Sequence, residues 1–375
     1  MDIIHSLKNN INNVRGFTTN RKIIVIESDD WGSIRMPSKE TYELLAHKSK
    51  YIKDNPYCQN DTLATKEDLE ALFDVLLKFK DKNGRHPVIT ANTVVGNPDF
   101  QKIKDSNFTE YYYEPFVKTL KNYYPNEDTY AMWEEGIKEK LFYPQFHGRE
   151  HVNASYWLQL LQNNQPIALS SFEQMCWAMP PLERNIQASY DVVTEVEEQF
   201  ACNGVDEGLT LFENLFGYKS QSFIANNFIW SPAIEKVLDS HGVQTIQGMK
   251  YQKMPLLYKN EKNQKRRLLR HLTGTQNKYN QVYLVRNCVF EPSQNMSKKE
   301  DVTRCFSEIK NAFFWKKPAI ITVHRLNFIG KLNHKNRSEN LKKLEKLLAL
   351  ILKTWPDVEF MTSDALGQFI IESKN

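Results

Sequence analysis

Residues 21–32 read RKIIVIESDDWG, and this stretch determines how the rest of the chain is interpreted. Four consecutive apolar residues, Ile23–Ile26, predict a strand that is buried on both faces, as in a parallel sheet. Polar residues follow at once and end in the pair Asp29 and Asp30, and Gly32 would ease a bend of the backbone there. The segment therefore predicts a buried strand that delivers two carboxylates to its carboxyl end.

Short apolar runs of the same kind recur along the chain and alternate with helical patterns. The further strands are expected at residues 88–95, 141–146, 167–172, 222–230, 243–248, 281–290, 319–324 and 358–364. The clearest helices are expected after the capping residue Thr65, over residues 232–242 with Gly242 at the end, and from Ser338 to just before Pro356. This alternation predicts an α/β fold with a parallel sheet that closes into a barrel.

No linker or internal repeat divides the sequence, so residues 1–375 are expected to form a single barrel domain. Residues 98–140 are rich in Tyr, Asn and Asp, and are longer than an ordinary connection between a strand and a helix. We expect an insertion around residues 98–140.

Composition excludes several classes of protein. The net charge of +4 is too small to indicate a nucleic-acid-binding protein. The five cysteines are widely spaced and form no CxxC pair, which argues against a disulfide framework and against a thiolate zinc site. The N-terminal residues lack the apolar stretch of a signal peptide, and no apolar run reaches the length of about 18 residues typical of a membrane span. We expect a cytoplasmic protein with no integral membrane segment.

Residues that could carry chemistry follow three of the predicted strands. They are the pair Asp29 and Asp30, then His147, and then His324. Because the carboxyl ends of parallel strands meet at one end of a barrel, we expect these side chains to lie close together. His151 follows His147 by four residues, a spacing that would put both imidazoles on one face of a helix.

Asp30, His147 and His151 are the predicted ligands of a divalent metal ion. A carboxylate and two histidines form one of the ligand sets of catalytic zinc, so zinc is the favoured ion. Each feature is weak alone, since an HxxxH pair occurs by chance in many helices and a double Asp is often turn chemistry or a helix cap. Their shared position at strand ends strengthens the prediction.

The same residues resemble the motifs of the polysaccharide deacetylase family, also called NodB-homology or carbohydrate esterase family 4 proteins. ESDDWG at residues 27–32 corresponds to a TFDDG-like motif, and HGREH at residues 147–151 to an H[S/T]xxH motif. ITVHRL at residues 321–326 corresponds to a strand that ends in Leu-His. The resemblance covers residues from about 21 to 370. It implies a distorted, TIM-like (β/α) barrel of seven strands with inserted loops, and metal-dependent removal of an N-acyl group, most simply acetyl, from a sugar or glycan precursor.

The resemblance also implies a role for each matching residue. Asp29 corresponds to the catalytic base, and His324 to the general acid that protonates the departing amine. Asp30, His147 and His151 correspond to the metal ligands. A metal ion in such a site activates water and polarises the acyl carbonyl, which agrees with these roles.

The sequence departs from the family at three motifs. Gly148 stands in place of the Ser or Thr of the second motif. Residues 223–232 read FIANNFIWSP where the family has an Arg and a Pro-rich stretch, so the Arg that orients the base is not at its usual place. Arg149, Arg286 and Arg325 are the candidates to replace it. The fourth motif, an Asp with a downstream Trp, is not recognisable.

A further set of residues could line a sugar-binding cleft, because most of them follow predicted strands and Trp31 could stack on a pyranose ring. The candidates for substrate binding are Trp31, Asn92, Arg149, Asn227, Trp230, Arg286, Glu291 and Arg325. For each of them, packing or loop capping explains the residue equally well.

Two other functions remain open at this stage. A glycoside hydrolase on a related barrel could use Asp29 and Glu291 as its two carboxylates, and would not need a metal ion. A catalytically silent carbohydrate-binding protein would explain the altered third motif. In each case the expected partner is a carbohydrate or an N-acylated small molecule, and the oligomeric state is left open.

Overall fold

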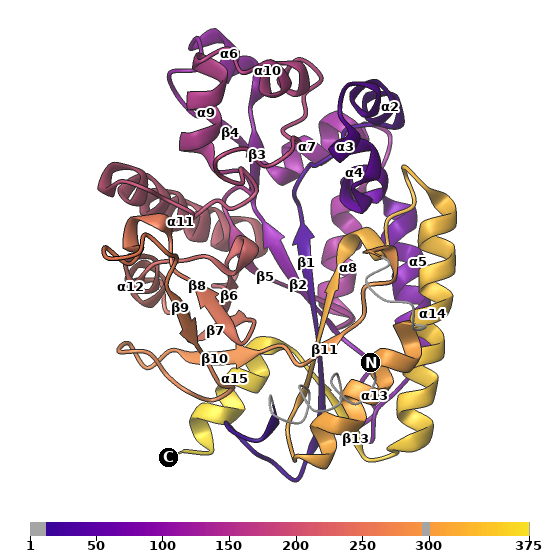
Figure 1. Cartoon of the computed structure of the whole chain (residues 1–375). Helices are drawn as coiled ribbons and strands as arrows, with labels where there is room; N and C mark the ends of the chain where they lie inside the picture. Colours follow the sequence, from indigo (N-terminus) through magenta and orange to yellow (C-terminus); the bar gives the residue numbers. More distant parts are fainter. Residues whose placement is uncertain (1–12, 295–300, 375) are drawn as a thin grey trace.

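The computed structural model describes residues 13–294 and 301–374. Its main sheet is parallel and is built around the central strand β1 (Lys22–Trp31), shown in Figure 1. The other strands are β2 (Ile89–Val94), β5 (Phe142–Gly148), β6 (Ser222–Ile224), β7 (Thr245–Gly248), β10 (Val282–Val285), β11 (Cys288–Val289), β12 (Ala319–His324) and β13 (Val358–Met361). Their order is β10-β7-β6-β5-β2-β1-β12-β11, and β13 also pairs with β1. The predicted α/β class and parallel sheet are confirmed.

The sheet curls into a partial barrel because its two edge strands are consecutive in the chain. β10 pairs with β7 at one edge, β11 pairs with β12 at the other, and only Arg286 and Asn287 separate β10 from β11. Residues 281–290, expected as one strand, are therefore divided between the two edges. With β13 the sheet has nine strands, so the expected number of seven is wrong.

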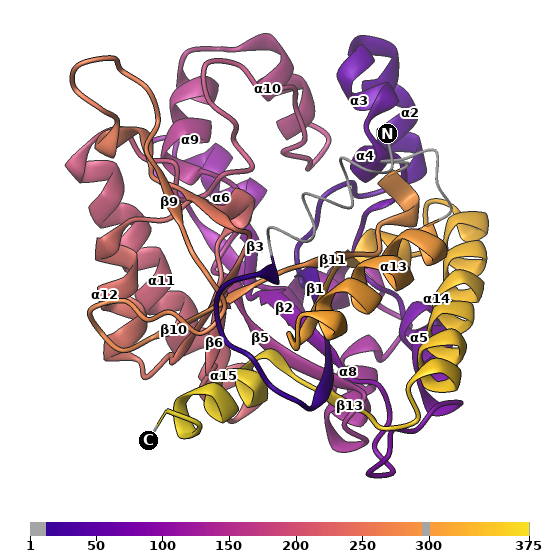
Figure 2. The same cartoon turned by 60° about the horizontal axis from the view of Figure 1, so that its bottom comes forward.

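Helices cover the outside of the curled sheet (Figures 1 and 2). They are α5 (Lys66–Leu77), α8 (Thr129–Lys138), α11 (Glu195–Phe216), α12 (Pro232–Ser240), α13 (Asp301–Phe314), α14 (His334–Thr354) and α15 (Ser363–Glu372). α5 begins at the predicted cap, where Thr65 and Asp68 form a reciprocal capping box. In the described ranges, no helix is both long enough and apolar enough to cross a membrane.

Shorter elements gather at the carboxyl ends of the strands, at the top of Figure 1. They are α2 (Lys39–Lys48), α3 (Lys50–Asp54), α4 (Pro56–Asn60), β3 (Gly96–Pro98), α6 (Phe100–Asp105), β4 (Tyr113–Pro115), α7 (Phe116–Tyr123), α9 (Ala154–Gln162) and α10 (Pro166–Phe172). Residues 167–172 were expected as a strand but belong to α10, because Gln165 caps the first amides and Pro166 suits a first helical turn. Residues 98–140 contain α6, β4, α7 and α8, and α8 packs against α5 and β5.

An antiparallel hairpin and four short 3-10 helices complete the fold. The hairpin consists of β8 (Tyr251–Lys253) and β9 (Leu268–Arg270). The 3-10 helices are η1 (Asn226–Phe228), η2 (Leu256–Tyr258), η3 (Pro292–Gln294) and η4 (Arg325–Asn327). Of these, η1, η3 and η4 directly follow or adjoin the strand ends where the predicted chemistry lies.

A β-bulge near the end of β1 bends the backbone at the two aspartates. Ser28 pairs with Ala91 of β2 and Trp31 pairs with Thr93, so β1 uses one residue more than β2 over this interval. Asp30 has a φ of +75°, in the left-handed region that Asp tolerates better than most side chains. The bend expected at this strand end is therefore present, and Asp30 itself takes part in it.

The bulge decides which side chains of β1 face the barrel interior. Ile23 and Val25 pack with β10 and α15, whereas Ile24 and Ile26 pack in the cluster formed with α5 and α14. Regular alternation would place Trp31 on the same side as Ile23. Trp31 instead packs in the α5 and α14 cluster, because the extra residue reverses the alternation.

Gly32→Ala is expected to destabilise the fold more than its matched control, Gly84→Ala. Both glycines have a similar positive φ, +78° and +76°, so each substitution carries a backbone cost of about 1 kcal/mol. A Cβ at Gly32 would also lie 2.2 Å from the carbonyl oxygen of Val94, whereas the described residues leave open space at Gly84. We expect a further loss of about 2 kcal/mol for Gly32→Ala in urea unfolding. Equal losses for the two variants would contradict the close approach of β1 and β2.

Candidate active site

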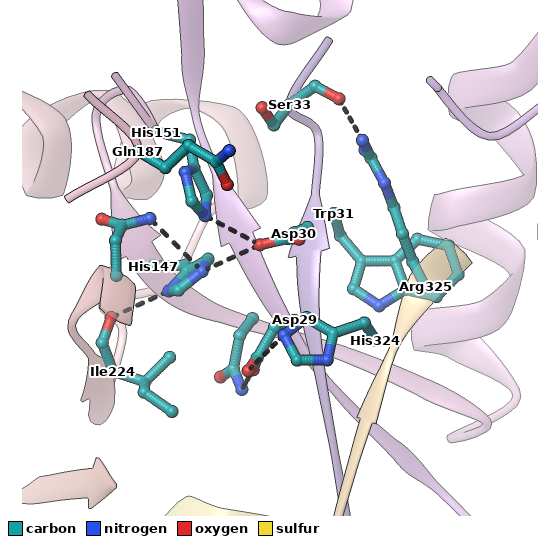
Figure 3. Close-up of polar contacts among 12 residues, drawn as sticks. Asp29, Asp30, Trp31, Ser33, His147, His151, Gln187, Ile224, His324 and Arg325 are labelled. Atoms are coloured by element: carbon teal, nitrogen blue, oxygen red, sulfur yellow. Dashed lines mark hydrogen bonds and ion pairs between the residues drawn. The ribbon is translucent and has the colours of Figure 1, made fainter. Parts of the chain in front are cut away.

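The carboxyl ends of β1, β5 and β12 bring the predicted metal ligands and catalytic residues into one cavity (Figure 3). Asp30 Oδ1 lies 3.0 Å from His151 Nε2 and 3.3 Å from His147 Nε2. The three possible ligand atoms lie within 4.8 Å of one another, and all three side chains are buried. The cluster proposed from the sequence is therefore close enough to share one ion.

A backbone hydrogen bond determines which nitrogen of His147 faces the cluster. The Nδ1 of His147 lies 2.9 Å from the carbonyl oxygen of Ile224 in β6. Because a carbonyl oxygen can only accept, Nδ1 carries a proton and donates it, which leaves Nε2 as the nitrogen available to a metal ion. Nε2 is the nitrogen directed at Asp30, as a metal ligand requires.

His147 and His151 converge without lying on a helix, so the expectation of a shared helix face is wrong. His147 belongs to β5, and α9 begins only after Asn153, whose side chain caps it. The chain turns between the two histidines at Gly148, where φ is +124° and a Cβ would lie 2.7 Å from the hydroxyl oxygen of Tyr190. The residue that departs from the second motif is thus required by the local backbone.

The ring of His151 is held by Asp30 at Nε2 and by stacking on Trp177. Its plane lies 11° from that of Trp177, with ring centroids 5.8 Å apart. Its Nδ1 has no hydrogen-bond partner among the described residues. Burial lowers the pKa of His151 despite the opposing effect of Asp30, which favours the neutral imidazole that binds metal ions.

Arg35 holds the second oxygen of Asp30, and sequence reasoning missed this residue. Its Nη2 donates to Asp30 Oδ2 over 3.1 Å, which leaves Oδ1 as the oxygen facing both histidines. Arg35 also pairs with Asp61, which in turn binds Arg325. Burial alone would raise the pKa of Asp30, but His151 and Arg35 outweigh it and hold the pKa well below its ordinary value.

Arg286 is the residue that orients Asp29. Its Nη1 and Nη2 each donate to one oxygen of the Asp29 carboxylate over 2.6 Å, and its Nε donates to Glu27 over 2.6 Å. Asn92 adds a hydrogen bond of 2.8 Å to Asp29 Oδ1. Burial opposes ionisation of Asp29, yet Arg286 prevails and the pKa of Asp29 is lowered. Arg149, Arg286 and Arg325 were the candidates to replace the missing arginine. Among the described residues, Arg286 is the one of these three that binds the Asp29 carboxylate.

His324 lies beside Asp29 because their strands pair in register. Asp29 of β1 is opposite His324 of β12, and His324 Nε2 is 3.7 Å from Asp29 Oδ2. The other ring nitrogen, Nδ1, is 2.5 Å from Glu291 Oε1. Burial would lower the pKa of His324, but Glu291 and the two aspartates outweigh it and raise the pKa to about 9. The imidazole is therefore protonated at neutral pH, as a general acid must be.

The cluster opens into a cleft with an empty volume of about 610 Å³. Asn227, predicted as a substrate-binding residue, lies on its wall. Sequence reasoning missed five other lining residues, Arg35, Tyr57, Gln187, Ala225 and Phe228. These residues come from loops and short helices, where the sequence carries no periodic signal that could have identified them.

Four of the predicted substrate-binding residues lie elsewhere, so these predictions are wrong. Trp31 and Trp230 are 1% exposed, and their indole N–H groups bind Ser28 and Glu235. Arg149 pairs with Glu150 and Glu207. Arg325 is fully buried and binds Asp61 and the carbonyl oxygen of Ser33. All four side chains are used in packing or in buried ion pairs.

Three more of the predicted substrate-binding residues support the catalytic pair instead of lining the cleft. Asn92 and Arg286 bind Asp29, and Glu291 binds His324. Each of the three is buried. Their positions at strand ends are as expected, but their partners are the carboxylate and the imidazole.

The donor set fits a divalent metal ion. It offers two imidazole nitrogens and one carboxylate oxygen, the set found in catalytic zinc sites. His147 is fixed in the required tautomer, and Asp30 presents one free oxygen. No other group of three or more possible ligands occurs within residues 13–294 and 301–374.

No protein-family model matches the chain, and no curated protein matches its sequence. Solved structures with a similar fold include a Mycobacterium smegmatis protein classed as a polysaccharide deacetylase, at 9% identity and a TM-score of 0.45, covering 96% of this chain and 94% of that one. A polysaccharide deacetylase from Bacillus cereus matches at 12% identity and a TM-score of 0.31, over 77% of this chain and 68% of the other.

A third similar structure is the 4-alpha-glucanotransferase from Thermococcus litoralis, at 9% identity and a TM-score of 0.44. The alignment covers 92% of this chain, which spans only 40% of the length of that enzyme. These similarities concern the fold alone, so any function must be argued from the site.

Glu291→Gln is expected to lower the pKa of His324 from about 9, because Glu291 is the largest of the influences that raise it and only Asp29 and Asp30 then oppose the effect of burial. Ring nitrogen shifts in NMR titrations would measure the change. The exposed Glu345→Gln is the control and should leave the pKa unchanged. Since the folded pKa is raised, the stabilisation from His324 is complete below about pH 6.5 and disappears as the pH rises through 9. An unaltered pKa in Glu291→Gln would show that a group other than Glu291 keeps the imidazole protonated.

Proposed function

We propose that this protein is a metal-dependent hydrolase that removes an N-acyl group, most simply acetyl, from a sugar or glycan precursor. The observation that carries the proposal is the position of the Asp30, His147 and His151 cluster directly beside the Asp29 and His324 pair, in one cleft. The match of these five residues to the deacetylase motifs supports the same reaction.

Asp30, His147 and His151 would hold the ion, and zinc suits their two nitrogens and one oxygen. A divalent ion in this position supplies a Lewis acid that polarises the acyl carbonyl and makes water more acidic. The lowered pKa of His151 and the single free oxygen of Asp30 prepare the chain's side of this site. The positive charge of Arg35 balances the negative charge of Asp30 in this buried cluster.

Asp29 and His324 divide the proton transfers. Asp29 is ionised, so its carboxylate can accept the proton of the attacking water. His324 is protonated through Glu291, so its Nε2 can give a proton to the departing amine nitrogen. Arg286 holds the base and Glu291 holds the acid, which keeps the two groups in opposite protonation states.

The glycoside hydrolase alternative finds less support in the same contacts. Both oxygens of Asp29 accept hydrogen bonds from Arg286, and Glu291 accepts from His324 and Asn327. Glu291 is buried and does not line the cleft, so it is not placed as a second catalytic carboxylate, and a glycosidase leaves the cluster at Asp30 unexplained. Activity that survives removal of all metal would favour the glycosidase.

Purified protein is expected to contain about one equivalent of a divalent ion, preferentially zinc, by elemental analysis. His147→Ala and His151→Ala should each lower the metal content after dialysis and abolish acetate release from N-acetylated sugars, because each removes one of three ligands. His241→Ala, at a partly exposed histidine paired with Asp206, is the matched control and should keep both. Metal content equal to that of the unaltered protein in all three variants would disprove the metal site.

Asp29→Asn is expected to keep the metal ion and lose turnover. The substitution removes the proton acceptor but none of the three ligands, so kcat should fall by roughly 100- to 10,000-fold while metal content is unchanged. The measurement is acetate release beside elemental analysis of the same sample. Unchanged turnover would contradict the role of Asp29 as the base.

A further inference from the structure

The cleft above the metal cluster has a continuous wall on most of its circumference. The ring of Tyr57 meets that of His324 edge to face, with centroids 5.3 Å apart, and the guanidinium of Arg35 lies 4.6 Å from the Tyr57 ring centroid. Arg35 Nη1 donates to Gln187 Oε1, and Asn227 Nδ2 donates to the Gln187 carbonyl oxygen, both over 2.9 Å. These contacts join one side of the cleft to the other without a break.

Two inserted segments build this wall and pack against each other, α2 to α4 and the loop that follows α10 (Figure 1). Met36, Leu45, Ile52 and Cys58 from the first share a buried cluster with Cys176 and Ala178 from the second. The indole N–H of Trp177 also donates to the carbonyl oxygen of Ile34 over 2.8 Å. The wall is thus part of the packed structure, and separating the segments would expose an apolar cluster.

The wall is anchored on its other side as well. Gln294 Nε2 donates to the hydroxyl oxygen of Tyr57 over 2.8 Å and also binds Glu291, the partner of His324. On the side between Phe228 and His324, the guanidinium of Arg286 lies 6.0 Å from the Phe228 ring centroid and binds Asp29. At the base of the cleft, Asp29 and Asp30 are 3% and 2% exposed, so a reacting group must descend below the rim.

We propose that the cleft admits a free N-acylated sugar, or the terminal residue of a short glycan, and excludes residues in the interior of a chain. This inference rests on the proposed function and specifies its substrate class. An interior residue needs room on two sides for its neighbouring sugars, whereas the contacts from His324 through Tyr57, Arg35 and Gln187 to Asn227 close the cleft along this wall. The Tyr57 and Phe228 rings offer apolar surface, and Gln187 and Asn227 offer amide groups for hydroxyls.

The test compares free and linked forms of the same sugars on the zinc-loaded protein. N-acetylglucosamine and N-acetylgalactosamine are supplied as monosaccharides, and N-acetylglucosamine also as its β-1,4-linked tetramer. Acetate release gives the rate, and tandem mass spectrometry of the tetramer shows which residue has lost its acetyl group. We expect reaction of a monosaccharide or of one terminal residue, with interior residues slower by on the order of 100-fold.

Tyr57→Ala tests whether the wall is what excludes interior residues. Removal of the ring opens the wall between Arg35 and His324, so the share of interior deacetylation should rise at least tenfold. Gln187→Ala opens a different part of the wall and repeats the test if Tyr57→Ala does not fold. Interior residues that react as fast as terminal ones in the unaltered protein would overturn this inference and leave the proposed function intact. No acetate from any of the sugars would reject the proposed function, and this inference with it.

Discussion

The β-bulge near the end of β1 is the constraint on which the rest of the site depends. A regular strand would direct Asp29 and Asp30 to opposite faces of the sheet, one inward and one towards the helices. The extra residue, together with the left-handed conformation of Asp30, turns both carboxylates into the same cavity. It also turns Trp31 outward into the hydrophobic cluster. One local irregularity thus creates the pair of carboxylates and removes an aromatic ring from the cleft.

Two buried carboxylates side by side are costly unless positive groups accompany them. The fold supplies those groups in two separate chains of contacts. Arg286 lies between Glu27 and Asp29, and Arg35 lies between Asp61 and Asp30. The separation lets the two aspartates differ, since Arg286 holds both oxygens of Asp29 whereas Asp30 presents one oxygen to the histidines.

The departures from the deacetylase motifs have physical explanations in the structure. Gly148 is needed where β5 turns with φ at +124° against Tyr190, so a hydroxyl-bearing side chain would be strained there. The arginine missing from residues 223–232 is replaced by Arg286, which reaches Asp29 because it joins the two edge strands of the curled sheet. The same electrostatic contact is made from a different place in the chain.

The sequence by itself determined the α/β class and the strands that end in polar residues, and it predicted that Asp29, Asp30, His147, His151 and His324 lie close together, as they do. These features follow from local patterns, namely apolar runs, caps and strand-end positions, which are written in consecutive residues. It did not determine that residues 167–172 form a helix, because the Gln165 cap and the preceding turn override a short apolar run. Sequence reasoning also expected four residues to line a substrate cleft that are buried in the structure, namely Trp31, Trp230, Arg149 and Arg325.

Only the tertiary structure decided the partners of the central residues. Arg35, Tyr57 and Gln187 reach the cavity from loops and a short helix, and Arg286 reaches it through the curl of the sheet. Even the convergence of His147 and His151, expected from helical spacing, comes from a turn at Gly148 and a ring stacked on Trp177. Contacts between residues distant in sequence depend on how the sheet curls and how the loops pack, and no local pattern encodes them.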